Sequence, residues 1–236
     1  MTQPSMERVL RQRLAPERLQ PYIVAAGSPR AAIRLYQWNV EVSGASYEAL
    51  HVVEVVLRNS LHDQLSLLHA KRNGVGSWLD SPFAELTDRA RADIVTARQR
   101  AREGLARKQS PPARGAALRA IKPTDGDVVA QLGFGFWRYL LATRYTHTLW
   151  LDALRHAFPH LTPQAVSHVE GPVQRLHLLR NRIAHLEPVF GSNLALSLQD
   201  MTTLLGYACP RTQAWFGATR APRLKAALAA RPAPKR

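Results

Sequence analysis

The stretch that indicates the fold most clearly runs from residue 46 to residue 71: SYEALHVVEVVLRNSLHDQLSLLHAK. Its apolar residues recur three and four positions apart, so an α-helix would place them on one face. They are Tyr47, Leu50, Val53, Leu57, Leu61, Leu65 and Leu68. The turn-forming pair Asn73-Gly74 follows and is expected to end the helix. We therefore predict a long helix whose apolar face lies in the core.

The same spacing recurs along most of the chain, whereas alternating strand-like runs bounded by turns do not. We therefore expect an all-α protein, with a single domain over residues 1–229 and a disordered basic tail over residues 230–236. Start and stop signals predict helices from Ser5 to Leu14, from Ser28 until Gly44 breaks the pattern, and over residues 84–105, 124–141, 146–158, 162–187, 193–208 and 210–229.

The chain is strongly basic, with 32 Lys and Arg against 17 Asp and Glu, a formal net charge of +15. Such an excess favours a polyanionic partner. Most of the positive charge is arginine, whose planar guanidinium binds phosphate with two hydrogen bonds and stacks on bases, so nucleic acid fits better than a membrane surface. The alternative is a compositional preference for arginine without a function.

Cys209 is the only cysteine, so one chain can build neither a disulfide nor a zinc site made of several thiolates. No apolar run approaches the roughly 20 residues that span a bilayer, and the polar N-terminal residues do not resemble an export signal. We expect a cytoplasmic protein with no membrane partner.

A basic, proline-rich stretch, RKQSPPARG over residues 107–115, predicts a loop inside the domain, within the wider segment 107–123. The loop can serve as a hinge or as an arm that contacts RNA. The apolar segment after it centres on Phe134, Phe136 and Trp137. Such a cluster usually belongs to the core or to a subunit interface, and a platform for base stacking is the alternative.

Polar residues interrupt the apolar pattern of residues 46–71, and they include Glu54, Arg58, Asn59 and His62. Glu54 and Arg58 are four residues apart, as are Arg58 and His62, so each pair shares a helix face. Two interpretations stay open. The residues form a weakly stabilising ladder of ion pairs, or they form a polar row that faces an active site.

The segment with the most chemical content is Arg180-Asn181-Arg182-Ile183-Ala184-His185, at the end of a helix that Glu187-Pro188 is expected to stop. Asn181 and His185 are four residues apart and share a face. Arg180 is rotated by about 100° from Asn181, so Arg180 and His185 converge only through a local rearrangement or a second chain. A helix C-terminus favours a protonated imidazole, which suits His185 to proton transfer.

These residue types suit cleavage of RNA by its own 2′-hydroxyl. One group removes the proton of the 2′-hydroxyl, another protonates the leaving 5′-oxygen, and a cation stabilises the charge on the phosphate, so neither a metal nor a cofactor is required. One chain supplies one histidine and one arginine, and two chains complete the set. The alternative is structural: His185 caps its helix, and Arg180 pairs with Glu187 or Glu54.

The segment from Arg180 to His185 resembles the Arg-(four to six residues)-His signature of the HEPN superfamily, in the form Arg-Asn-x-x-x-His. Three blocks in order resemble its Abi-like branch, the abortive-infection proteins of bacteria. They are residues 54–59 (EVVLRN), 132–137 (LGFGFW) and 179–185 (LRNRIAH). The resemblance spans residues 47–190, most of the chain.

The resemblance implies a HEPN-like helical bundle with additional helices, and a homodimer in which the two motifs face each other. It also implies a metal-independent endoribonuclease that acts against phage or as a toxin, with RNA as substrate and an antitoxin as a further partner. In this interpretation His185 transfers protons, Arg180 binds the phosphate and Asn181 orients them. The supporting residues would be Glu54, Arg58 and Asn59.

Two other classes of function compete with the ribonuclease. The first is a non-catalytic HEPN-type module that binds RNA or a partner protein, because a fold does not fix a function. The second is a DNA-binding protein, which ranks last because no helix-turn-helix is recognisable and the Arg-His motif would be unexplained.

Overall fold

The computed structural model describes residues 6–72 and 74–233. Within these ranges all regular structure is helical and no strand occurs, which confirms the all-α prediction. In chain order the elements are α1 (Met6–Arg13), α2 (Pro16–Ala26), α3 (Pro29–Lys71), α4 (Asp88–Arg107), α5 (Gly115–Ala120), α6 (Asp125–Gln131), α7 (Phe134–Leu140), the short helices η1 (Thr143–Tyr145), η2 (Thr146–Trp150) and η3 (Leu154–Ala157), α8 (Ser167–Ala184), α9 (Leu194–Ala208), α10 (Pro210–Thr219) and α11 (Ala221–Ala229).

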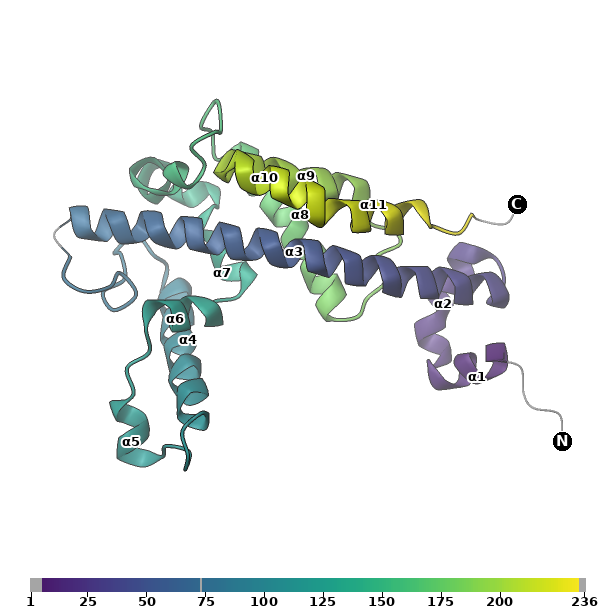
Figure 1. Ribbon diagram of the computed structural model, residues 1–236, viewed down its shortest axis with the longest axis horizontal. Coiled ribbons are helices and arrows are strands. Elements are labelled where there is room, and N and C mark those ends of the chain that lie inside the picture. Colours follow the sequence, from purple (N-terminus) through teal and green to yellow (C-terminus); the bar gives the residue numbers. More distant parts are fainter. Residues whose placement is uncertain (1–5, 73, 234–236) are drawn as a thin grey trace.

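Helix α3 is 43 residues long and forms the axis on which the other elements pack (Figure 1). Ser28 caps its start, where the hydroxyl accepts a hydrogen bond from the amide of Ala31 at 3.3 Å. The prediction that Gly44 breaks the helix is wrong. Gly44 lies on the exposed side, and the burial of its neighbours Val42 and Ala45 outweighs the roughly 1 kcal/mol that a glycine costs inside a helix.

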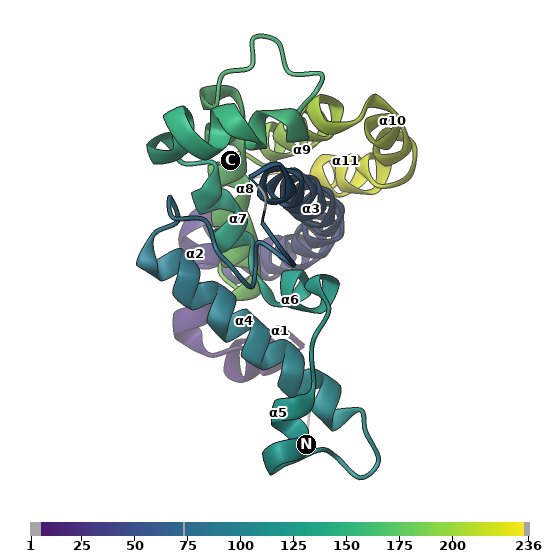
Figure 2. The same cartoon turned by 90° about the vertical axis from the view of Figure 1, so that its left-hand side faces the viewer.

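The other helices lie on different sides of α3. Helices α9, α10 and α11 run along one side, and α4, α5 and α6 extend from the other side as an arm (Figures 1 and 2). Helix α8 packs against α3, α7 and α9. Buried apolar side chains from α2 to α11 form one hydrophobic cluster around α3. The helix that carries the Arg-His motif therefore lies directly against the central helix.

Three of the four aromatic residues of α7 are buried. Phe134, Phe136 and Trp137 are 2%, 6% and 0% exposed, because α7 packs against both α3 and α8. They belong to the core, so the suggestion that these three rings offer a subunit interface is wrong. They are also unavailable as a platform for base stacking.

Several helix boundaries differ from the prediction where the apolar pattern is weak. Residues 146–158 form the short helices η2 and η3 in place of one helix, α8 begins at Ser167, and residues 210–229 divide into α10 and α11. The division falls just before Pro222, which has no amide hydrogen to continue the hydrogen bonding of α10. The basic segment 107–123 contains the short helix α5.

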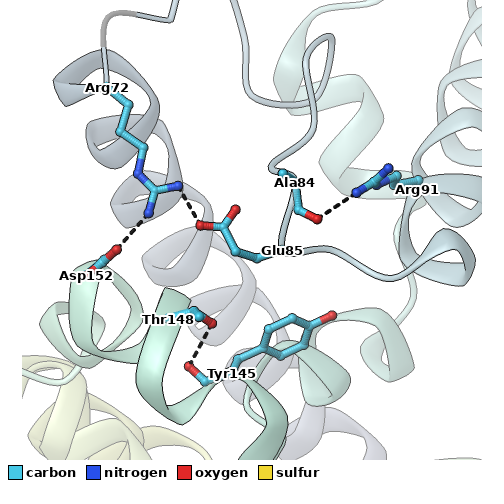
Figure 3. A network of polar contacts seen from close by, with 7 residues as sticks. All are labelled: Arg72, Ala84, Glu85, Arg91, Tyr145, Thr148 and Asp152. Atoms are coloured by element: carbon cyan, nitrogen blue, oxygen red, sulfur yellow. Dashed lines mark hydrogen bonds and ion pairs between the residues drawn. The ribbon is translucent and has the colours of Figure 1, made fainter.

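Arg72, the residue after α3, joins three segments of the chain. Its guanidinium bonds Glu85 in the loop before α4 and Asp152 between η2 and η3, at 2.7 Å each (Figure 3). Close by, Arg91 of α4 donates a hydrogen bond to the carbonyl of Ala84 at 2.7 Å (Figure 3). These contacts hold the start of α4 against the body of the molecule.

The start of the segment 230–236 contacts α3. The guanidinium carbon of Arg231 lies 5.1 Å from the centre of a ring of Trp38, and the indole of Trp38 donates a hydrogen bond to the carbonyl of Ala227 at 2.7 Å. Residues 234–236 and Ser5, the expected cap of the first helix, lie outside the described residues. No helix in the described ranges combines the length and the apolar character that crossing a membrane requires.

Candidate functional site

Helix α8 carries three polar side chains in a row at four-residue intervals: His177, Asn181 and His185, the last at the helix end. The side-chain nitrogen Nδ2 of Asn181 lies 3.2 Å from Nε2 of His177 and donates a hydrogen bond to it. His177 is not among the residues predicted from the sequence. Its four-residue spacing from Asn181 is the signal that could have found it, because residues at that spacing are neighbours on a helix.

Arg180 extends from α8 toward α3. Its Nε lies 3.9 Å from Oε2 of Glu54, and the two side chains are 32% and 20% exposed. This distance is too long for a hydrogen bond, and Nε of Arg180 has no hydrogen-bond partner among the described residues. The guanidinium is therefore held beside Glu54 by charge, with a buried Nε that makes no hydrogen bond to any described residue.

His177 lies in a partly buried and positively charged environment. Burial lowers the pKa of His177, and the charges of Arg138 and Arg180 lower this pKa further. Helix α7 approaches the ring closely, since a Cβ added to Gly135 would lie 3.1 Å from Nε2 of His177. The surroundings therefore favour the neutral imidazole, whose Nε2 accepts the hydrogen bond from Asn181.

Replacing Arg180 by glutamine is expected to raise the pKa of His177, because one of the two nearby cations is removed. The measurement is an NMR titration of the imidazole. Since folding lowers this pKa, the neutral ring contributes stability above the pKa of an unfolded histidine, and this contribution is lost as the pH falls through the folded pKa.

Arg182→Gln is the matched control for this titration. The Arg182 side chain is exposed and donates to the carbonyl of Pro188 at 3.3 Å, so its removal is expected to leave the pKa of His177 unchanged. Equal titration curves for Arg180→Gln and Arg182→Gln would contradict the proximity of Arg180 to His177.

The supporting residues expected on α3 differ in their relation to the motif. Glu54 contacts Arg180. Arg58, one turn further along, is partly buried, and its Nε has no hydrogen-bond partner in the described part of the chain. Asn59 is exposed, and no contact within the described ranges links its side chain to the motif of α8. The structure therefore brings Glu54 to the site and leaves Asn59 apart from it.

His185 lies at the C-terminal cap of α8 with an exposed side chain. Its backbone amide donates to the carbonyl of Asn181 at 2.9 Å. Five residues along a helix rotate two side chains by about 140°, and no contact among the described residues joins the imidazole to Arg180. One chain by itself thus does not bring the two ends of the motif together, as the spacing predicts.

A tight turn determines how the chain continues after His185. Leu186 has a φ of 57°, in the left-handed region that glycine usually occupies at a helix end. Arg18 of α2 donates a hydrogen bond to the carbonyl of Leu186. The amide of Val189 donates to the buried side chain of Asn39 on α3 at 2.8 Å. These bonds fix the backbone directly after His185.

His177 and Asn181 also line a cleft of about 490 Å³ between α4, α7 and α8. Helix α4 contributes Arg89 and Arg100 to its wall, and Asp93 is the one acidic residue among the residues that line it. The cleft therefore offers positive charge beside a neutral imidazole. Arg180 and His185 do not line this cleft.

In the described ranges, no three His, Cys, Asp or Glu side chains lie close enough together to hold a metal ion. Comparison of the chain with protein-family models, with curated proteins and with solved structures finds no match. The candidate site is thus characterised by its own geometry: the Glu54–Arg180 pair, the His177–Asn181 hydrogen bond, and the exposed His185.

Proposed function

We propose that the chain is a metal-independent endoribonuclease of the HEPN type, which cleaves RNA by attack of the 2′-hydroxyl on the adjacent phosphate. The observation that carries the proposal is the pair of polar contacts on neighbouring faces of α8, in which Arg180 pairs with Glu54 of α3 and Asn181 bonds His177 beside α7. A guanidinium whose side chain is 32% exposed suits a phosphate, and imidazoles suit proton transfer.

Each residue of the motif has a role in the proposed reaction. Arg180 binds the scissile phosphate and stabilises the charge that develops on it, and Glu54 keeps the guanidinium in position. The 2′-oxygen loses its proton and bonds to phosphorus, and the bond to the 5′-oxygen breaks as that oxygen receives a proton. His185 transfers protons in this step, and Asn181 orients the polar row of α8.

The reaction needs a proton acceptor and a proton donor at the same phosphate. His177 and His185 of one chain are separated by about 12 Å along the helix axis, too far to serve one phosphate together. We therefore propose that the second imidazole comes from a second copy of the chain, in a homodimer with facing motifs. Exposed apolar side chains on α8 and directly after it support such a contact, since Leu178 and Leu186 are 53% and 70% exposed.

The resemblance to abortive-infection proteins extends the proposal to a cytoplasmic role in phage defence or as a toxin, with an antitoxin as a further partner. The net charge of +15 agrees with RNA as the substrate. The competing proposal is a non-catalytic HEPN-type module that binds RNA or protein. The separation of His185 from Arg180 within one chain is the observation in its favour.

The dimer is tested by measuring RNA cleavage per chain over a range of protein concentrations. A site composed of two chains predicts a specific activity that rises with concentration and reaches a plateau where sedimentation shows the dimer. A specific activity that is constant while the protein is monomeric would contradict the shared site. RNA binding without cleavage at every concentration would favour the binding module.

A further inference from the structure

Two neighbouring hollows lie beside the candidate site. The first, of about 390 Å³, lies between the start of α4, α7 and η1, and the second is the cleft of about 490 Å³ that reaches His177. Arg89, Asp93, Phe136 and Tyr139 line both, so the two hollows share a wall. We call them together the α4–α7 groove.

The two halves of the α4–α7 groove differ in chemistry. The first half is lined largely by apolar groups that include Ala90, Leu140 and Ala142. The second half is lined by polar groups, which are Thr96, Arg100, Gln131, His177 and Asn181. A nucleotide has the same division, since its base is flat and largely apolar on its faces while its sugar and phosphate are polar. The apolar half of the groove thus suits a base, and the polar half suits the sugar and phosphate of the same nucleotide.

Tyr139 lies where the two halves meet. Its side chain is 43% exposed, and the guanidinium carbons of Arg89 and Arg138 lie 5.2 Å and 4.8 Å from the centre of its ring. An exposed ring among cations is the arrangement on which bases of single-stranded nucleic acid stack. Tyr139 is thus the exposed neighbour of the three buried rings Phe134, Phe136 and Trp137, for which the sequence had suggested a stacking platform.

The arginines of the groove are not neutralised by carboxylates. Within the described residues no ion pair involves Arg89, Arg100 or Arg144, which line the groove, and none involves Arg138, which lies over the ring of Tyr139. Arginines elsewhere do pair with Asp or Glu, as in the case of Arg72, Arg98, Arg175, Arg220 and Arg223. Unpaired guanidinium groups in a groove attract the phosphates of a nucleic acid.

The arm, whose helix α4 forms one wall of the groove, is itself basic. Residues 88–131, from α4 to α6, contain ten Lys or Arg and five Asp or Glu, so the arm carries +5 of the net +15, with Arg89, Arg100 and Asp93 of the groove included. Both views show it extending away from α3 (Figures 1 and 2). A strand that enters the groove can therefore continue along a basic surface.

The far end of the groove is fixed by polar contacts. The hydroxyl of Tyr145 accepts a hydrogen bond from the amide of Thr87 at 3.4 Å. The Arg91–Ala84 and Arg72–Glu85 bonds hold the preceding loop and the start of α4 in the same region (Figure 3). The wall that α4 forms is thus positioned independently of the ligand.

We propose that the α4–α7 groove binds an unpaired segment of RNA, with one base stacked on Tyr139 and the flanking phosphates bound by Arg89 and Arg100. The inference rests on the proposed function, because it names the substrate class of the proposed ribonuclease through a groove that reaches His177 and Asn181. A duplex is excluded since its bases are already stacked on one another and cannot reach the ring. The substrate is therefore single-stranded RNA, or a loop within a folded RNA.

The test is the binding of a fluorescent RNA of about 12 nucleotides, a length within the usual range of such sites. The RNA is 2′-O-methylated, so that no 2′-hydroxyl attack can occur, and it is compared alone and annealed to its complement. Tyr139→Ala is expected to weaken binding of the single strand roughly tenfold, while Tyr139→Phe keeps the affinity. The double variant Arg89→Ala, Arg100→Ala is expected to weaken RNA binding and also to make the affinity for RNA less dependent on salt concentration.

Two variants serve as matched controls. Trp215→Ala removes another exposed ring with an arginine beside it, but Arg220 is paired with Glu48, and α10 lies on the other side of α3 from α4 (Figure 2). Arg34→Ala removes an exposed arginine of α3. Both are expected to bind as the wild type does.

The proposal is wrong if Tyr139→Ala binds the single strand as tightly as the wild type does. It is also wrong if the wild type binds the single strand and the duplex equally well. Because this RNA cannot be cleaved, the result is independent of catalysis. A protein that depends on Tyr139 for binding but never cleaves RNA would support the groove and refute the ribonuclease. If the wild type cleaves RNA but Tyr139→Ala binds the single strand as tightly as the wild type does, the ribonuclease is supported and the groove is refuted.

Discussion

Replacing His185 by alanine is expected to abolish RNA cleavage, with a loss of about 10²–10⁴-fold or more, while the affinity for RNA stays nearly unchanged. The imidazole is exposed at the end of α8 and makes no contact within the described chain on which the fold depends. Its removal therefore takes away proton transfer and little else. The cleavage rate and the dissociation constant for RNA are measured on the same preparation.

The matched control for this variant is His168→Ala. His168 is also an exposed histidine of α8, but it lies in the first turn, at the opposite end of the helix. It is expected to cleave at the wild-type rate. If His185→Ala cleaves as fast as His168→Ala, the assignment of proton transfer to His185 is wrong.

Replacing Arg180 by alanine is expected to weaken both steps, cleavage by roughly 10²–10³-fold and RNA binding by a smaller factor. The reason is that, in the proposed mechanism, the guanidinium contacts the phosphate in the bound state and more strongly in the transition state. The variant also leaves Glu54 without its ion-pair partner, so the negative charge of Glu54 is no longer compensated. Single-turnover cleavage and equilibrium binding separate the two effects.

Two further variants show which property of Arg180 accounts for the loss of cleavage and binding in Arg180→Ala. Arg182→Ala removes the exposed arginine two residues away and is expected to be nearly neutral. Arg180→Lys keeps the charge but loses the planar fork, so it is expected to restore binding better than cleavage. If Arg180→Ala cleaves at the wild-type rate, Arg180 is not the phosphate ligand.

The helical architecture could be predicted because the apolar face of α3 is nearly continuous, from Leu50 to Leu68. The prediction failed at Gly44, where local helix propensity is unfavourable but burial of the neighbouring residues decides the outcome. It also failed for residues 146–158, where no long apolar face selects a single helix. Patterning thus predicts the fold class well and the interruptions poorly.

In the candidate site, too, residues close together in the sequence could be predicted, whereas contacts that depend on packing between helices could not. Arg180, Asn181 and His185 are adjacent in sequence and could be recognised as one motif, and Glu54 was among the partners expected for Arg180. The role of His177 depends on how closely α7 approaches α8, which no local pattern reveals.

The α4–α7 groove lies still further from what a sequence can show. Arg89 and Arg138 come from different helices and meet at Tyr139 only after the arm has packed against α7. Its residues could be recognised as basic or aromatic, but not as neighbours.

The most direct test of the ribonuclease is incubation of the wild type and His185→Ala with mixed RNAs in EDTA, followed by analysis of the new RNA ends. We predict cleavage by the wild type alone, with 2′,3′-cyclic phosphate on the upstream fragments, because the 2′-hydroxyl is the nucleophile. Cleavage that EDTA abolishes, fragments that end in a 3′-hydroxyl, or equal cleavage by the two proteins would contradict the proposed mechanism.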